Sequence, residues 1–162
     1  MKTLCLLRHA KAGWMSGESS DFERSLDERG MADAPVMARL LRDHAFSPEL
    51  IAASPSKRTR QTARIFADSL GYPAARISCD EKIYYEGIDG LLTVIRAFDD
   101  NLSRAMLVGH NPYLTILAEW LSGEKFANIP PCGLVALNFP VDSWLDVERG
   151  IGSLLFYDYP KA

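Results

Sequence analysis

The chain has 162 residues, of which 48% are hydrophobic and 24% charged, and its formal net charge is −3. This is the length of one ordinary domain, which can bury a core without disulfides or metal ions. The composition excludes disordered, collagen-like and coiled-coil chains. The mildly acidic balance gives no electrostatic basis for binding nucleic acid or a membrane surface. It leaves room for a small basic pocket, because net charge does not report where charges lie.

Cysteine use and the N-terminal residues predict a cytoplasmic protein. Cys5, Cys79 and Cys132 are far apart and form no C-x-x-C pair, so neither a disulfide framework nor a zinc knuckle is indicated. The apolar run that follows Lys2 stops at Arg8, too early for a secretory signal. No segment approaches the roughly 20 apolar residues that span a bilayer. We therefore expect no membrane association.

The first part of the chain predicts a strand, a long loop and a helix. Residues 3–7 are a short apolar run that ends abruptly in charge, as a buried parallel strand does. Residues 10–25 are rich in Gly, Ser and charge, which indicates a long loop of a kind often used for function. Asp27 would cap a helix that reaches about Asp43. Pro35 lies inside this helix and predicts a kink or a late start.

The remaining chain alternates strands and helices. A strand at 50–53 precedes Ser54-Pro55, where a capping hydroxyl and a proline predict the start of a helix that ends at Gly71. The later expected elements are a brief strand at 75–78, a helix at 88–98, a strand at 105–108, a helix from Asn111-Pro112 to Gly123, and strands at 134–139 and 153–157. This alternation predicts a three-layer α/β/α sandwich with a mainly parallel central sheet. No linker or repeat interrupts it, so residues 1–162 are expected to form a single domain.

Basic side chains follow three of these strands, at the sheet edge where ligands bind in open α/β folds. Two arginines and two histidines come directly after a strand or within the next helical turn: Arg8, His9, Arg58 and His110. The long loop can bring Arg24 to the same rim. We therefore expect two histidines and three arginines to converge on one pocket.

This combination of side chains suits phosphoryl transfer. Arginine forks bind phosphate oxygens bidentately and stabilise the charge that spreads over them in the transition state. A neutral histidine is a nucleophile toward phosphorus, and neighbouring arginines disfavour its protonated form. The pattern predicts phosphoryl transfer without a metal ion, because arginine replaces the cation. No H-E-x-x-H or carboxylate-rich cluster accompanies the histidines to suggest a metal site.

Three motifs, in this order, resemble those of the histidine phosphatase superfamily, whose fold is phosphoglycerate mutase-like. Residues 7–10 (LRHA) resemble R-H-G with alanine in the glycine position. Residues 54–63 (SPSKRTRQTA) resemble S-P-x-x-R-x-x-Q-T, and residues 109–112 (GHNP) resemble G-H-N-P. The short length and the spacing between Arg8 and Gly30 resemble the small SixA-type phosphohistidine phosphatases.

The resemblance implies a role for each matched residue. His9 corresponds to the nucleophile that becomes phosphorylated, and Arg8 and Arg58 to phosphate-binding arginines. Arg24 corresponds to a further arginine that contacts phosphate, and His110 to a second histidine that donates to the phosphoryl oxygens. The implied activity is metal-independent hydrolysis of phosphohistidine on a protein, through a phosphohistidine intermediate on His9 and with no cofactor.

The fourth segment departs from the family pattern. Many members place a carboxylic acid there to protonate the leaving group, whereas Tyr84-Tyr85-Glu86 has tyrosine at the aligned position and Glu86 one position later. Either Glu86 reaches the site by a small shift or no dedicated acid is present. The departure favours phosphohistidine as substrate, because its leaving nitrogen can be protonated near neutral pH. It disfavours a mutase.

Alternatives remain for some residues and for the function. Ser54 is interpreted as a helix cap, since no G-x-S-x-G elbow surrounds it. Arg24 could instead pair on the surface with Asp21 or Glu23, and Lys11 is a candidate at the entrance that solvation explains nearly as well. The alternative functions are a phosphatase for a small-molecule or nucleotide phosphate ester and a non-catalytic phosphate-binding module. The partner is a phosphorylated protein or a small phosphorylated substrate, and a monomer is expected.

Overall fold

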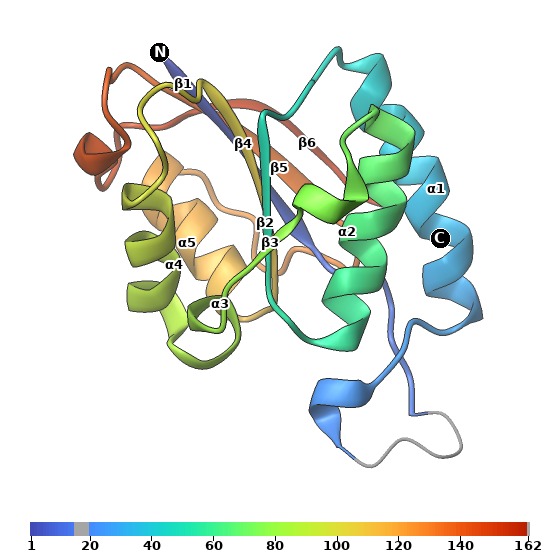
Figure 1. The fold of residues 1–162 in the computed structure, drawn as a ribbon. Helices are drawn as coiled ribbons and strands as arrows, with labels where there is room; N and C mark the ends of the chain where they lie inside the picture. Colours follow the sequence, from blue (N-terminus) through green and yellow to red (C-terminus); the bar gives the residue numbers. More distant parts are fainter. Residues whose placement is uncertain (15–19, 162) are drawn as a thin grey trace.

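A six-stranded sheet forms the centre of the molecule, and helices cover both of its faces (Figure 1). The computed structural model describes residues 1–14 and 20–161. The strands are β1 (Lys2–Arg8), β2 (Leu50–Ala53), β3 (Ser78–Cys79), β4 (Arg104–Gly109), β5 (Leu134–Phe139) and β6 (Ser153–Asp158). Their order is β3-β2-β4-β1-β5-β6, and among these strands β5 alone runs against its neighbours. The expected mainly parallel sheet is confirmed.

The helices form the two outer layers. They are α1 (Glu28–Asp43), α2 (Lys57–Leu70), α3 (Lys82–Tyr85), α4 (Gly87–Arg96) and α5 (Tyr113–Ser122). Figure 1 shows α1 and α2 on one face of the sheet and α4 and α5 on the other. Successive residues of a strand point to opposite faces, so Leu4 and Leu6 pack with α4 and α5 while Cys5 and Leu7 pack with α1 and α2. This confirms the three-layer α/β/α sandwich.

Local structure differs from the sequence-based expectation at three places. The helix α1 begins at Glu28 and runs through Pro35, so the expected late start is wrong; the Asp27 carboxylate caps it by accepting from Gly30 N at 2.8 Å. A 3-10 helix at Ala74–Arg76 takes most of the strand expected at 75–78, and β3 follows it. The helix α2 begins at Lys57, later than predicted.

The segment after β1 is held against both helices of one layer. Thr62 Oγ1 accepts from Ala10 N at 3.0 Å and donates to Arg58 O at 2.8 Å. Gln61 Oε1 accepts from Leu26 N at 2.8 Å. At Gly30 a Cβ would lie 2.1 Å from the Lys11 carbonyl oxygen, which explains a glycine there. The Q-T pair of the second motif therefore fixes the chain on both sides of the long loop.

Candidate active site

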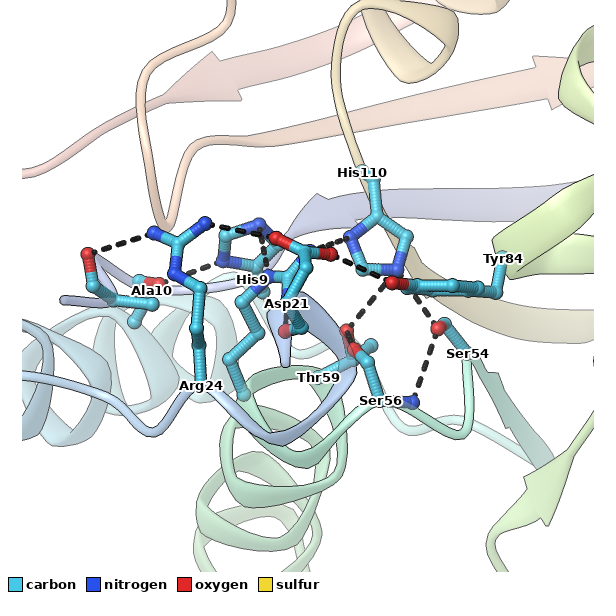
Figure 2. Close-up of polar contacts among 11 residues, drawn as sticks. His9, Ala10, Asp21, Arg24, Ser54, Ser56, Thr59, Tyr84 and His110 are labelled. Carbon is cyan, nitrogen blue, oxygen red and sulfur yellow. Dashed lines mark hydrogen bonds and ion pairs between the residues drawn. The ribbon is translucent and has the colours of Figure 1, made fainter. Parts of the chain in front are cut away.

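The carboxyl ends of β1, β2 and β4 bring the expected side chains to one edge of the sheet. Arg8 pairs with Gly109, and Ala53 pairs with Val108. His9, Ser54 and His110 each follow directly, and Figure 2 shows their side chains converging on one pocket. The rings of His9 and His110 lie 5.2 Å apart between centroids.

His9 presents a neutral ring with one fixed tautomer. Its Nδ1 lies 2.8 Å from the Ala10 carbonyl oxygen, which can only accept, so Nδ1 carries the proton and Nε2 keeps its lone pair. Burial, together with the smaller effects of the charges of His110, Arg58 and Arg8, lowers the pKa of His9 to about 3, although the hydrogen bond to Ala10 acts in the opposite direction. The imidazole is therefore unprotonated at neutral pH and is a competent nucleophile at Nε2.

Arg58 links the two histidines. This buried arginine donates from Nε to His9 Nε2 at 3.3 Å and from Nη2 to His110 Nδ1 at 3.4 Å. Its remaining contacts go to Asp21, with Nη1 donating to the carbonyl oxygen at 2.7 Å and Nη2 to Oδ2 at 3.1 Å. The guanidinium thus lies beside the attacking atom.

Ser54 sets the tautomer of His110. Because Nδ1 accepts from Arg58, the proton lies on Nε2, which donates to the fully buried Ser54 Oγ at 2.8 Å. Burial, together with the charge of Arg58, lowers the pKa of His110 to about 4, so this ring is also neutral at neutral pH. A hydroxyl can donate as well as accept, so Ser54 lets a neutral His110 turn Nδ1 into a donor toward a phosphoryl oxygen. The interpretation of Ser54 as a helix cap is wrong, because Ser56 is the N-cap residue of α2.

Asp21 is a pocket residue that the sequence-based prediction missed. Its Oδ1 accepts from Arg24 Nη1 at 3.0 Å, and its Oδ2 accepts from the Tyr84 hydroxyl at 2.6 Å and from Arg58. Figure 2 shows the carboxyl group between Arg24 and Tyr84. Partial burial raises the pKa of Asp21, but hydrogen bonds from Tyr84 and Arg24 and the charge of Arg58 lower it to about 2. The spacing of Asp21 and Arg24 indicated an ion pair, though not its place in the pocket.

Two further arginines have donors available for an anion. Arg8 donates from Nη1 to the Ile129 carbonyl oxygen at 2.8 Å, and Arg24 donates from Nη2 to that of Ala12 at 3.3 Å. The Nε atom of each guanidinium is buried without a hydrogen-bond partner among the described residues. Buried N–H donors normally have a partner, so the two orphaned donors fit a ligand with several oxygens, such as a phosphoryl group.

Comparison with known proteins places this geometry in a family. The model of the histidine phosphatase superfamily (branch 1) matches residues 4–83. The chain is 30% identical to a SixA protein of Agrobacterium tumefaciens, over 99% of both chains, and the two structures agree with a TM-score of 0.82. The chain belongs to the histidine phosphatase superfamily and is of the SixA type.

Two other proteins are similar to this chain, one in structure and one in sequence. A protein histidine phosphatase SixA, solved in complex with tungstate, shares the fold with a TM-score of 0.79 at 19% identity, over 96% of this chain and 95% of that one. An uncharacterised chloroplastic protein of Arabidopsis thaliana is 29% identical over 88% of this chain and 69% of its own length. The expected membership of the superfamily is confirmed, and the matched residues 4–83 contain the first two of the three motifs.

The structure does not bring every predicted residue of the SixA-type site into the pocket. Glu86 lies between α3 and α4, where its side chain is exposed, and it makes no hydrogen bond or ion pair with the pocket among the described residues. Tyr84 enters the pocket instead, because α3 turns it toward Asp21. Lys11 is exposed and lines a cavity with Arg29 and three prolines, in which none of the arginines and histidines of the pocket takes part.

The described part of the chain contains neither a cluster of metal ligands nor a membrane-spanning helix. Within residues 1–14 and 20–161, no three His, Cys, Asp or Glu side chains lie together as a metal site requires. None of the helices in the same ranges is long and apolar enough to cross a membrane. The residues at 15–19, which belong to the loop expected at 10–25, lie outside the described residues.

Replacing Ser54 with alanine is expected to lower kcat about 5- to 150-fold. The change removes the nearer partner of His110 Nε2 and leaves only Thr59 Oγ1, at 3.4 Å, and a poorly satisfied buried donor costs about 1–3 kcal/mol. Steady-state rates measure the loss, and nitrogen NMR of the imidazole reports the altered tautomer of His110. Ser122→Ala is the control, because that partly buried hydroxyl donates to the Ala118 carbonyl oxygen at 2.7 Å, at the end of α5 away from His110. Equal losses in both variants would contradict the role of Ser54.

The two neutral histidines make folding stability depend on pH. Their pKa values of about 3 for His9 and about 4 for His110 lie well below the ordinary value of 6.5. Below pH 6.5 the unfolded chain binds protons that the folded chain does not, so the free energy of unfolding falls as pH decreases toward 4. At pH 5 each histidine is expected to cost about 2 kcal/mol. Urea unfolding at pH 7 and pH 5 measures the difference, which should shrink in His110→Asn; an unchanged difference would contradict it.

Proposed function

We propose that the protein is a phosphatase that hydrolyses phosphohistidine on a protein, through a phosphoryl group carried covalently on His9. The observation that carries this proposal is the neutral His9 ring, whose Nε2 lone pair lies beside the Arg58 guanidinium. Similarity to SixA proteins supports the substrate class. The proposal includes a metal-independent reaction, since arginines supply the positive charge, and a cytoplasmic monomer that binds neither nucleic acid nor membranes.

The first step transfers the phosphoryl group to the enzyme. The phosphoryl oxygens take the free donors of Arg8 and Arg24 and displace Arg58 from His9 Nε2, which frees the lone pair for attack. A bond forms between His9 Nε2 and phosphorus, and the bond from phosphorus to the leaving nitrogen breaks with its electron pair on that nitrogen. Fixed guanidinium donors stabilise the charge that spreads over the oxygens.

The second step returns the free enzyme. Water attacks phosphorus, the bond to His9 Nε2 breaks, and the electron pair returns to that nitrogen. The hydrogen bond from His9 Nδ1 to the Ala10 carbonyl oxygen keeps the ring in one orientation, so the nucleophile is ready for another cycle. Through both steps His110 donates to a phosphoryl oxygen, with Ser54 adjusting the tautomer.

A substrate panel tests the proposed function. Values of kcat/KM are compared for a protein domain that carries phosphohistidine and for nucleotide, sugar and other small phosphate esters. At least a tenfold preference for the phosphohistidine protein is expected, because its nitrogen leaving group is protonated more easily than an alkoxide. A large preference for an ester would replace the proposal by a metabolite phosphatase. Calorimetric binding of phosphate without hydrolysis of any substrate would indicate a binding module.

A further inference from the structure

We propose that Asp21 is the carboxyl group that exchanges protons with the leaving group and with water in this reaction. The inference rests on the proposed function and deepens it, because it assigns the acid for which the fourth segment supplies only Tyr84 and an exposed Glu86. Three donors from three parts of the chain hold this carboxylate at the reacting centre: Arg24, Arg58 and Tyr84.

The carboxylate lies beside the attacking atom. One guanidinium, that of Arg58, donates from Nε to His9 Nε2 and from Nη2 to Asp21 Oδ2 at 3.1 Å. A phosphoryl group bonded to His9 Nε2 therefore lies next to the carboxyl oxygens. The Asp21 side chain is 49% exposed although its donors are partly buried, so its open side faces the approach of substrate and water.

Substrate binding changes the proton affinity of this carboxyl group. In the free enzyme, hydrogen bonds from Tyr84 and Arg24 and the charge of Arg58 hold the pKa of Asp21 at about 2. Phosphoryl oxygens compete for the same arginine donors and add negative charge beside the carboxylate. The loss of cationic partners and the gain of a like charge both raise the pKa. A proton is therefore taken up from solvent when the phosphorylated substrate binds.

Asp21 then donates this proton in the first chemical step and accepts a proton from water in the second. As His9 Nε2 bonds to phosphorus, the leaving nitrogen takes the electron pair of the broken bond and receives the proton of Asp21. The resulting carboxylate next accepts a proton from the attacking water, while the electron pair of the broken phosphorus–nitrogen bond returns to His9. The products are the dephosphorylated nitrogen compound and inorganic phosphate. Asp21 ends protonated, as it was in the complex with substrate, and returns that proton to solvent when phosphate leaves and the arginine donors bind the carboxylate again.

Tyr84 acts as a positioning residue for this carboxyl group. Its hydroxyl donates to Asp21 Oδ2 at 2.6 Å. Its ring meets those of His110 and Phe22 edge-on, at centroid distances of 5.3 Å and 5.2 Å. The ring is therefore fixed on two sides, and the hydroxyl directs one carboxyl oxygen. This explains why a tyrosine can stand where other members place an acid.

The test uses the full chain and a series of aryl phosphates whose leaving groups differ in pKa. In Asp21→Asn the amide oxygen still accepts from Arg24 or Tyr84, but it carries no proton to donate. The kcat for phenyl phosphate, with a poor leaving group, is expected to fall about 10²- to 10⁴-fold. The phosphorylation burst with 2,4-dinitrophenyl phosphate, whose leaving group needs no proton, should stay within about tenfold of the wild type.

Two further measurements complete the test. Rapid quench should show phosphorylated His9 accumulating in Asp21→Asn, because water then lacks a base. Tyr84→Phe should lower kcat less than Asp21→Asn does, and its effect should depend on the leaving group in the same way. Glu23→Gln is the matched control and should be unchanged, since that exposed carboxylate lies in the same 3-10 helix outside the pocket.

The outcomes separate this inference from the proposed function. If Asp21→Asn lowered the phosphorylation rate equally for all aryl phosphates, Asp21 would only position the arginines and would not donate a proton. If Asp21→Asn lowered KM and left kcat unchanged or higher, the Asp21 carboxylate would only compete with the phosphoryl group for the arginine donors. Either result overturns the inference while His9 is still labelled in the wild type. The absence of label on wild-type His9 would overturn the proposed function itself.

Discussion

Replacing His9 with alanine is expected to lower kcat by at least about 10⁴-fold, the scale on which nucleophile removal acts in enzymes with a covalent intermediate. The physical reason is that His9 Nε2 holds an unprotonated lone pair beside Arg58, and alanine removes the atom on which the phosphoryl group would be carried. Initial rates with a phosphohistidine protein and with an aryl phosphate measure the loss.

His44→Ala is the matched control for this experiment. His44 directly follows α1, and its exposed ring stacks on Phe156 and pairs with Asp158, outside the pocket. Its replacement should leave kcat unchanged. Thermal unfolding of both variants shows whether each is folded. Turnover of a folded His9→Ala variant at the wild-type rate would rule out the covalent route.

Replacing Arg58 with alanine is expected to lower kcat/KM about 10³-fold or more, the second largest effect. Arg58 is buried and touches both histidines, so its loss removes the cation that meets the phosphoryl oxygens in the transition state. Arg58→Lys keeps the charge but loses the planar fork, and is expected to recover only part of the activity. Steady-state kinetics and competitive inhibition by inorganic phosphate measure the two variants.

Arg60→Ala provides the control on the same helix. Arg60 lies two residues after Arg58 and donates from Nε to the Pro55 carbonyl oxygen at 2.8 Å, on the exposed side of α2. Its removal should change kcat/KM by less than about twofold, as for a surface residue far from the chemistry. Losses of equal size at Arg58 and Arg60 would show that general charge, and not the pocket, governs the reaction.

The sequence predicted the fold and the centre of the site because both depend on short-range patterns. Apolar runs such as residues 3–7 become buried strands, and a basic residue directly after a strand must lie at its carboxyl end. Parallel pairing of β1 with β4 then brings His9 and His110 to the same edge, whatever the rest of the chain does. Arg58 could be predicted at the same edge, because it lies in the first turn of α2, directly after β2.

The missed features depend on how distant segments approach one another. Asp21 reaches Tyr84, 63 positions later, through the path of the loop and the 3-10 helix, which no periodicity encodes. Ser54 resembles a helix cap in sequence, but the later start of α2 frees its hydroxyl for His110. Glu86 stays outside because α3 is a single short turn that points Tyr84 inward instead.

The most direct measurement is a rapid-quench experiment with a radiolabelled phosphohistidine protein. The account predicts a burst of label on the wild-type enzyme, acid-labile and base-stable as a phosphoramidate is, located on His9 by peptide mapping and absent from His9→Ala. Label on a residue other than His9 would contradict the account. So would full turnover without labelled enzyme, both on the millisecond scale and in single-turnover mixtures with stoichiometric enzyme.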